Sequence, residues 1–505
     1  MTLLQTELLA QLAGTFPRAV AWRNLADGSE LSLGHWHTQS NRLARGLMAR
    51  GLGAGQRIVL AITEDEPFPW LISYMAVHRI GAVAVPLNTR LGGPEMLRIL
   101  AHAEPSLLLA SDRVLKAHPE VGSALDLVAS TEGSDPAYLR WRDLLDADSA
   151  RIDHHLSPLD VADIMYTSGT TGAPKGVTVQ HGGLSSTDRV PSNWLGLGFI
   201  SSSPFSTTSG SLLICGPMRG GLSGWFLPHF DPAQWLEAVA ASRPVAAFLV
   251  PAMVQLIVAH PDFESADLSS LAVVNIGSAP IATETLRHFG ARLPKADITC
   301  GYGMTEFGAV TSVPMGDGGQ HLGSVGKPLP GVAVRILDPD GTEVEVGQVG
   351  QVSIRGNRPR RTYWRDEASA RATWPDEWLL SGDLGLVDRD GFLWIVGRQK
   401  EMIIRGGHNI VPGEVESAIF EHPDVTDAAV AGIPHPVLGE DIAAWAVLRD
   451  GHALSTDALR AFLLERLADY KVPRRITFVE SLARNEAGKV LKAQLLTGDQ
   501  QRSAS

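Results

Sequence analysis

The run of residues 166–176, Tyr-Thr-Ser-Gly-Thr-Thr-Gly-Ala-Pro-Lys-Gly, has the composition of an anion-binding loop. Glycine permits positive φ and lets a phosphate approach backbone N–H groups, while the Ser and Thr hydroxyls and Lys175 add donors and a positive charge. The spacing differs from the common nucleotide loop, because Lys175 precedes a glycine and not Ser or Thr. Taken alone, a loop of this composition is more often a surface linker.

A second candidate stretch, Gly-Tyr-Gly-Met-Thr-Glu-Phe-Gly at 301–308, follows an apolar run. In it, Glu306 could bind Mg²⁺ through a hard oxygen, Thr305 could donate to a phosphate, and Tyr302 could stack on a base. One glutamate after a glycine is more often an ordinary turn carboxylate. Near the C-terminus, Lys489 follows a glycine, a pattern that is usually a solvated turn when it stands alone.

The elements around these loops alternate between helical and strand patterns. Apolar runs predict strands, and amphipathic runs predict helices between them. This alternation predicts parallel, doubly wound sheets, which bind ligands beyond the carboxyl ends of their strands. We therefore expect the loops after residues 166, 276 and 300 to meet at one crevice. The predicted strands here are 56–62, 81–85, 106–110, 161–166, 245–250, 272–276 and 297–300, and the helices are 41–50 and 70–79.

From residue 331 the pattern changes to short strands separated by turns, as in an antiparallel sheet. We predict an α/β protein with a large N-terminal domain of doubly wound sheets over residues 1–399. That domain includes a small β-barrel at about 330–396. A small, mobile α+β domain follows over residues 400–505. Its predicted helices are 413–420 and 456–470, and its strands are 428–432, 442–448 and 475–479.

Composition excludes several classes of protein. Hydrophobic residues make up 44% and charged residues 19% of the 505 residues, as in globular proteins. The net charge of −12 argues against a nucleic-acid-binding surface. The two cysteines, Cys215 and Cys300, form neither a disulfide framework nor a metal cluster, so we expect a cytoplasmic location. The N-terminus lacks the pattern of a signal peptide, and no apolar run is long enough to span a membrane.

Taken together and in order, these segments resemble the adenylate-forming superfamily, which includes acyl- and aryl-CoA synthetases, firefly luciferase and the adenylation domains of peptide synthetases. The resemblance extends from about residue 15 to residue 492. The shared order of the motifs outweighs the alternatives given above for each motif alone. The matching segments are 166–176, 301–306, 381–385, 397–400, 405–412 and 485–489.

The resemblance implies an ATP-dependent acyl-CoA ligase. In this chemistry a carboxylate attacks the α-phosphorus of ATP, which gives an acyl-AMP and releases pyrophosphate. The thiol of CoA then displaces AMP to form a thioester. Because the carboxylate and the polyphosphate repel each other, Mg²⁺, a lysine and fixed donors must offset their charges. The expected cofactors are therefore ATP and Mg²⁺, with CoA as the acyl acceptor.

The resemblance also implies the roles of individual residues. The expected catalytic residues are Lys489, which bridges the carboxylate and the α-phosphate, Thr305 at the α-phosphate and Glu306 on Mg²⁺. Lys400 is the expected hinge. Arg405, Gly406 and Gly407 are expected to face the pantetheine of CoA, with Arg405 as a candidate for its charged end. The expected ATP- and AMP-binding residues are Thr167, Ser168, Gly169, Thr170, Thr171, Gly172, Lys175, Gly277, Ser278, Ala279, Pro280, Gly301, Tyr302, Gly303, Asp383 and Arg398.

The sequence departs from the family pattern where the acid should bind. Ser206 stands where many CoA synthetases of the family carry a histidine, and no acidic residue adjoins Phe205 to pair with an amino group. We expect a bulky, mostly apolar carboxylic acid that is not an amino acid. Aliphatic, aromatic and polycyclic acids all remain open. The expected acyl pocket contains Phe205, Ser206, Gly210, Ser211, Gly277 and Gly301.

Two alternatives remain beside the CoA ligase. The protein could form the adenylate and pass the acyl group to a carrier-protein phosphopantetheine or to a partner ligase. It could also be a non-catalytic adenylate-binding protein, which the presence of Lys175, Glu306, Asp383, Arg398 and Lys489 disfavours. The sequence does not distinguish a monomer from a homodimer, or CoA from a carrier protein as the acceptor. It also leaves open the pathway and the consequence of Ser206.

Overall fold

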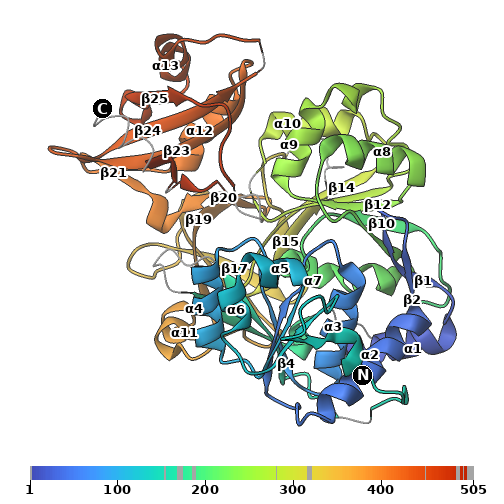
Figure 1. Ribbon diagram of the computed structural model, residues 1–505. Coiled ribbons are helices and arrows are strands. Elements are labelled where there is room, and N and C mark those ends of the chain that lie inside the picture. The colour runs from blue at the N-terminus through green and yellow to red at the C-terminus, as the bar shows by residue number, and fades with distance from the viewer. Residues whose placement is uncertain are drawn as a thin grey trace.

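The computed structural model describes residues 3–152, 155–167, 174–184, 189–279, 281–314, 321–449, 451–484, 490–492 and 494–496. Residues 168–173, Pro280 and Lys489, to which the resemblance gives ATP-binding and catalytic roles, lie outside this part of the chain. The described strands form four sheets, of seven, nine, four and five strands (Figure 1). Among the described helices, none is long and apolar enough to cross a membrane.

The seven-stranded sheet ends at the predicted anion-binding loop. Its strands are parallel except at the last pair, where β8 and β9 run antiparallel on either side of residues 168–173. The loop therefore joins two strands and does not lead into a helix. In sheet order, the strands are β7 (Leu139–Arg140), β6 (Val128–Ser130), β5 (Leu107–Ala110), β3 (Arg57–Ala61), β4 (Val83–Pro86), β8 (Val161–Thr167) and β9 (Lys175–Gln180).

The nine-stranded sheet carries the other two predicted loops. Strands β10 to β14 are parallel to their neighbours, and β14 turns back into β15 as an antiparallel hairpin. In sheet order, the strands are β16 (Lys327–Pro328), β15 (Gly308–Pro314), β14 (Asp297–Met304), β13 (Val273–Ile276), β12 (Ala246–Leu249), β10 (Gly198–Ser201), β11 (Ser223–Phe226), β1 (Val20–Asn24) and β2 (Glu30–Ser32).

This topology corrects one expectation. The loops after residues 166, 276 and 300 do not follow strands of a single sheet, because β8 belongs to the seven-stranded sheet while β13 and β14 belong to the nine-stranded one. Strand β14 also continues to Met304, so Gly301 and Gly303 lie within a strand and the turn begins at Thr305.

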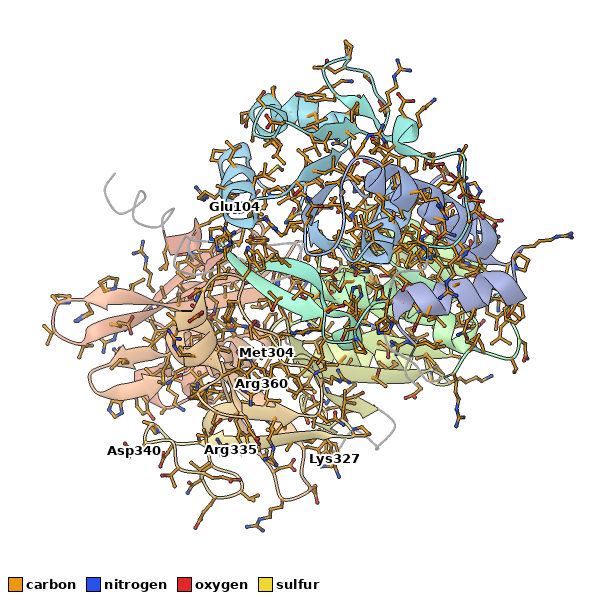
Figure 2. The ribbon with its side chains drawn as sticks, turned by 90° about the horizontal axis from the view of Figure 1, so that it is seen from below. Glu104, Met304, Lys327, Arg335, Asp340 and Arg360 are labelled. Atoms are coloured by element: carbon orange, nitrogen blue, oxygen red, sulfur yellow. The ribbon has the colours of Figure 1, made fainter. Side chains whose placement is uncertain are left out.

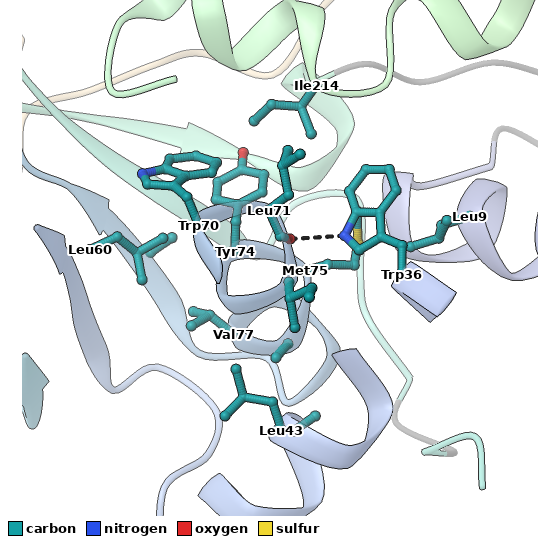
Figure 3. Close-up of a cluster of buried hydrophobic side chains, with 14 of the residues drawn as sticks. Leu9, Trp36, Leu43, Leu60, Trp70, Leu71, Tyr74, Met75, Val77 and Ile214 are labelled. Carbon is teal, nitrogen blue, oxygen red and sulfur yellow. Dashed lines mark hydrogen bonds between the residues drawn. The ribbon is translucent and has the colours of Figure 1, made fainter. Parts of the chain in front are cut away.

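Helix α3 (Pro67–Arg79) forms the centre of the largest core. Its residues 70–79 are all buried, as expected of a helix that is covered on every side. Its neighbours in the same apolar cluster include Leu60 of the seven-stranded sheet and Phe226 of the nine-stranded sheet. Figure 3 shows the indole of Trp36, from α2 (Leu33–Met48), donating to the carbonyl of Leu71 at 2.9 Å.

The other helices flank these sheets. Helices α8, α9 and α10 lie on one lobe, beside β12 and β14, as Figure 1 shows in green. The helices not yet given are α1 (Gln5–Thr15), α4 (Gly93–Ala103), α5 (Asp112–Ala117), α6 (Pro119–Gly122), α7 (Thr208–Leu213), α8 (Pro232–Ser242), α9 (Pro251–Ala259), α10 (Thr283–Ala291) and α11 (Glu367–Thr373).

The last two sheets come from the C-terminal third of the chain. The region predicted as a small barrel is an antiparallel sheet of β17 (Val332–Leu337), β18 (Gly350–Gly356), β19 (Leu379–Val387) and β20 (Leu393–Arg398). The five-stranded sheet forms a separate unit, orange to red in Figure 1, and packs on α12. It contains β21 (Ile403–Arg405), β22 (His408–Ile410), β23 (Val425–His435), β24 (Gly439–Leu448) and β25 (Arg475–Phe478), with helices α12 (Pro412–Phe420) and α13 (Thr456–Leu464). The α/β class, with a large N-terminal and a small C-terminal domain, is confirmed.

Candidate active site

The turn between β14 and β15 is held from three sides. The hydroxyl of Tyr363 donates to Oε1 of Glu306 at 2.9 Å. The guanidinium of Arg361 donates to the carbonyl oxygen of Thr305 at 2.9 Å, and the Thr305 hydroxyl shares a 2.9 Å hydrogen bond with that of Thr208 on α7. These contacts fix the backbone and both functional side chains of the turn.

The carboxylate of Glu306 suits a hard divalent cation. Tyr363 holds one of its oxygens, and no hydrogen bond or ion pair with another described residue occupies the second. A carboxylate that is oriented through one oxygen and available through the other matches the oxygen coordination that Mg²⁺ prefers. The donor set at this turn therefore fits the metal that the family resemblance implies.

A second cluster lies around Asp383, which is 4% exposed. The hydroxyl of Tyr302 donates to Oδ2 of Asp383 at 2.5 Å, and Nε of Arg398 lies 3.1 Å from Oδ1. Asp383 and Arg398 are direct neighbours across β19 and β20. Burial and the adjacent Asp383 carboxylate raise the pKa of Tyr302 well above its usual range, so the phenol stays protonated. A carboxylate accepts about four hydrogen bonds, so Asp383 keeps capacity for two further donors.

The end of β13 places a strained backbone beside β14. Gly277 lies next to Gly301, because a Cβ added at Gly277 would be 3.5 Å from the Gly301 carbonyl oxygen. Ser278 follows with φ of +81°. A non-glycine residue in this region costs about 1–3 kcal/mol, and such strain concentrates at binding sites. Ala279 completes the described part of the predicted adenine contact.

On the phosphate side, Lys175 begins β9 directly opposite Thr167 of β8. Its ammonium group donates to the hydroxyl of Ser369 on α11 at 3.0 Å and lies 5.4 Å from the ring centroid of Tyr363. Tyr363 therefore contacts both Lys175 and Glu306. The side chain of Tyr363 thus links Lys175 of β9 to the Thr305–Glu306 turn, which follows a strand of the other large sheet.

The predicted hinge lies close to the cluster around Asp383. Lys400 lies in a short 3-10 helix, Gln399–Glu401. Burial lowers the pKa of Lys400, and the positive charge of Arg398 lowers it further, while the carboxylates of Glu401, Asp383 and Glu306 act in the opposite direction. The ammonium group of Lys400 is therefore within electrostatic reach of the site.

The predicted glycine loop forms the turn between β21 and β22. Gly406 and Gly407 have φ of +56° and +84°, a conformation that favours glycine. Arg405 is only 7% exposed, and its guanidinium bonds Asp441 at 2.6 Å and the Tyr470 carbonyl at 3.1 Å. Its charge is neutralised inside the domain. The role of Arg405 at the charged end of CoA stays a prediction.

Three of the six predicted acyl-pocket residues lie in the packed core. Phe205 is 3% exposed and packs against the rings of Trp22, Trp70 and Phe226. A Cβ added at Gly210 would lie 1.9 Å from the Pro204 carbonyl oxygen, so this glycine permits a close backbone approach. Ser211 is 3% exposed and donates to the Thr208 carbonyl at 2.9 Å. Contact of Phe205, Gly210 and Ser211 with the bound acid stays a prediction.

Ser206 behaves differently. Its hydroxyl oxygen is buried and has no hydrogen-bond partner among the described residues. A buried hydroxyl without a partner costs about 1–3 kcal/mol, so a bound molecule or water would stabilise it. Ser206 therefore remains a predicted pocket residue, together with Gly277 and Gly301.

Sequence reasoning missed Arg361, Tyr363, Thr208 and Ser369. A signal was available for the first two, because residues 358–365, Arg-Pro-Arg-Arg-Thr-Tyr-Trp-Arg, contain four arginines in a chain of net charge −12. Such a concentration of one charge marks a segment that must contact acceptors or anions. For Thr208 and Ser369, no local pattern distinguishes them from other loop hydroxyls.

Comparison with known proteins identifies the family. The model of the AMP-binding enzyme family matches residues 9–364, and that of the AMP-binding enzyme C-terminal domain matches residues 414–489. A feruloyl-CoA synthase of Amycolatopsis is 35% identical over 95% of this chain and 96% of its own length. An indoleacetate–CoA ligase of Aromatoleum aromaticum is 33% identical over 89% and 90%. A fatty acid–[acyl-carrier-protein] ligase of Streptomyces coeruleorubidus is 31% identical over 93% and 92%.

Solved structures share the whole fold. An anthranilate CoA ligase in complex with anthranoyl-AMP superposes with a TM-score of 0.85 at 25% identity, covering 100% of this chain and 98% of that one. An amide bond synthetase from Marinactinospora thermotolerans gives 0.86 at 26% identity, over 98% and 99%. The chain therefore belongs to the AMP-binding enzyme family. It is an AMP-forming acid–thiol ligase, an ATP-dependent acyl-CoA ligase that works through an acyl-AMP, as the sequence predicts.

Proposed function

We propose that this ligase activates a bulky aromatic carboxylic acid with a short side chain between the ring and the carboxylate. The observation that carries the site assignment is the β14–β15 hairpin. At Tyr302 it contacts the expected ribose carboxylate Asp383, and at Glu306, four residues later, it carries the expected metal ligand. Two of the most similar relatives are named for ferulate and indoleacetate, and both of these acids have a ring and a short acidic side chain. The Ser206 hydroxyl, which has no hydrogen-bond partner in the described part of the chain, is available for a polar group on such an acid.

In the first half-reaction, the chain's own groups bind and orient the two anions. Asp383 and Arg398 hold the ribose, and Tyr302 lies against adenine. Lys175 and the loop 167–172 hold the β- and γ-phosphates, and Thr305 donates to the α-phosphate. Bound Mg²⁺, held by Glu306, supplies positive charge that offsets the repulsion between carboxylate and polyphosphate.

The second half-reaction requires a different arrangement of the small domain. We propose that residues 400–505 rotate about Lys400 relative to residues 1–399. Lys489 reaches the α-phosphate in one arrangement, and Gly406 and Gly407 face the pantetheine arm in the other. A unit that carries both a catalytic lysine and a glycine turn can serve both steps in alternation. The cytoplasm, which supplies ATP and CoA, is the proposed location.

A carrier protein is the second candidate acceptor. A relative at 31% identity is named as a fatty acid–[acyl-carrier-protein] ligase, and a carrier protein presents the same pantetheine thiol as CoA. The buried ion pair with Asp441 also makes the charge of Arg405 less available to the nucleotide end of CoA. This candidate predicts thioester formation on a phosphopantetheinylated carrier protein with little or none on free CoA.

The test is pyrophosphate release across a panel of aromatic, aliphatic and amino acids, followed by thioester analysis with CoA, with carrier protein, or with neither. We expect the highest kcat/KM with arylpropenoic and arylacetic acids, and a CoA thioester as product. Glu306→Gln should lower pyrophosphate release by about 10²–10³-fold. Faster turnover of small aliphatic acids or amino acids would refute the substrate proposal. Release without any CoA thioester, but with an acylated carrier protein, would favour the second acceptor.

A further inference from the structure

Residues 361–364 lie along the edge of the seven-stranded sheet and are held there by one isolated β-bridge. They lie between β18 and α11, and Tyr363 pairs antiparallel with Val177 of β9. The backbone N–H of Thr178 donates to the Thr362 carbonyl at 2.8 Å, and that of Trp364 donates to the Gly176 carbonyl at 2.7 Å. The segment is thus attached to the strand that leaves the phosphate loop.

Alternate side chains of this segment reach across to the β14–β15 turn. Residues two apart in an extended strand share one face. Arg361 and Tyr363 therefore point the same way, to the Thr305 carbonyl and the Glu306 carboxylate, each at 2.9 Å. Thr362 points the other way and shares a 3.0 Å hydrogen bond with the Thr178 hydroxyl. Figure 2 labels Met304 and Arg360, which precede the bonded residues Thr305 and Arg361 in the chain.

Arg361 is built to hold a fixed geometry. It is 4% exposed, and its two terminal nitrogens donate to the carbonyls of Thr305 and Gly183, each at 2.9 Å. Burial lowers the pKa of Arg361 to about 10, and the carboxylates of Asp163 and Glu306 oppose this effect. A buried cation with a planar, rigid fork of donors fixes both acceptors at once. The turn is thereby tied to Gly183, which follows β9.

We propose that Arg361 and Tyr363 are positioning residues that set the Glu306 carboxylate and the Thr305 backbone relative to the phosphate loop. This inference rests on the proposed role of Glu306 as the Mg²⁺ ligand. Because Tyr363 holds Oε1, the second oxygen is directed to one place, and the Lys175 ammonium lies over the same phenol ring. A change at either residue should therefore weaken metal-dependent binding of the nucleotide more than it disturbs the fold.

The first experiment uses Tyr363→Phe, which removes only the hydroxyl. The probe is Mn²⁺ with α,β-methylene-ATP, followed by the loss of the free Mn²⁺ signal in electron paramagnetic resonance. We expect the Mn²⁺ affinity of the ternary complex to fall about 10–100-fold, as for other residues that orient a metal ligand. Adenosine, which binds without metal, should retain its affinity. Tyr138→Phe, which changes a tyrosine outside the site, should change neither value.

The second experiment uses Arg361→Lys, which keeps the positive charge but loses the planar guanidinium that donates to two carbonyls at once. Its control is Arg79→Lys, because Arg79 is a similarly buried arginine, 6% exposed, that bonds Ser40 and His37 instead of the site. Both variants should lower the melting temperature. Only Arg361→Lys should weaken Mn²⁺ binding in the ternary complex and raise the Mg²⁺ concentration needed for half-maximal pyrophosphate release.

A third variant separates this inference from the function on which it rests. Glu306→Gln should weaken Mn²⁺ binding at least as much as Tyr363→Phe, and the double variant should be no weaker than Glu306→Gln alone. Wild-type Mn²⁺ affinity in Glu306→Gln would overturn the role of Glu306. Weak binding in Glu306→Gln together with wild-type binding in both Tyr363→Phe and Arg361→Lys would overturn the positioning role and leave the function intact.

Discussion

Replacing Asp383 by asparagine tests the ribose side of the site at nearly constant volume. The native carboxylate accepts from Tyr302 on one oxygen and faces Arg398 with the other. Asparagine has one acceptor oxygen and a donor NH₂ group, so one of these two donors must face another donor. The variant also loses the negative charge to which ribose hydroxyls would donate.

The expected magnitude follows from the strength of these bonds. A hydrogen bond to a charged group contributes about 1.5–3 kcal/mol, which corresponds to roughly 10–150-fold in an equilibrium constant. We expect the ATP affinity of Asp383→Asn to fall by about this factor. Stability should change less, by about 1 kcal/mol, because the Arg398 side chain is 36% exposed and solvent screens its charge.

Deoxynucleotides make the assay specific to the ribose. Calorimetric titration of wild type and Asp383→Asn with ATP, 2′-deoxy-ATP and 3′-deoxy-ATP gives a thermodynamic cycle that compares the protein change with each nucleotide change. In wild type, at least one deoxynucleotide should bind about 10-fold or more weakly than ATP. In Asp383→Asn that penalty should shrink, because the charged acceptor of the hydroxyl is replaced by a neutral amide with a single acceptor oxygen.

Two results would refute this reasoning. Wild-type affinity for ATP in Asp383→Asn would show that the carboxylate does not carry ribose binding. An unchanged deoxynucleotide penalty in the variant would show that the ribose hydroxyls meet a different group. Tyr302→Phe is the control, since it removes one bond to Asp383 but keeps the carboxylate, and it should keep the deoxynucleotide penalty.

Two further predictions concern stability. Arg405→Leu leaves the buried Asp441 carboxylate without its cation and should destabilise the C-terminal domain by about 3–5 kcal/mol in denaturant unfolding. The double variant Arg405→Leu with Asp441→Leu should recover much of this loss. A double variant as unstable as the single one would contradict the prediction. Burial, with Arg79 and Arg151, lowers the pKa of His37 from 6.5 to about 4, so the unfolded chain binds more protons than the folded chain between these values. Stability should therefore fall as pH drops from 6.5 towards 4, and His37→Gln should flatten that part of a thermal unfolding profile, which an unchanged slope would disprove.

Local sequence patterns predicted the elements well where one residue type dominates. The apolar run 106–110 became β5 at Leu107–Ala110, and the predicted helix 70–79 became α3, which begins at Pro67 because proline is favoured in the first helical turn. The predicted helix 41–50 begins too late in the chain. Helix α2 begins at Leu33, and the hydroxyl of Ser32 accepts from the His35 N–H at 3.2 Å as its N-cap.

Long-range placement was beyond such patterns. Periodicity does not indicate which sheet a strand joins. We therefore expected the three loops to follow strands of one sheet, although their strands belong to two sheets. The glycines of the run 301–303 indicated a turn, although cross-strand pairing with β15 keeps them extended. Phe205 packs against rings from three distant segments, and its small neighbours in the sequence do not indicate these contacts. The bond from Tyr363 to Glu306 spans 57 residues and leaves no local trace.

The β-bridge between Tyr363 and Val177 also determines how this region tolerates changes in chain length. By composition, residues 357–366 resemble a surface connection, where insertions and deletions are usually accepted. Because side chains of a strand alternate between faces, one residue inserted between Arg361 and Tyr363 would turn one of the two away from the β14–β15 turn. This segment should tolerate substitutions, but it should not tolerate an insertion or deletion that shifts its register. Length variation in homologues and in mutant libraries should therefore concentrate at other loops of the protein.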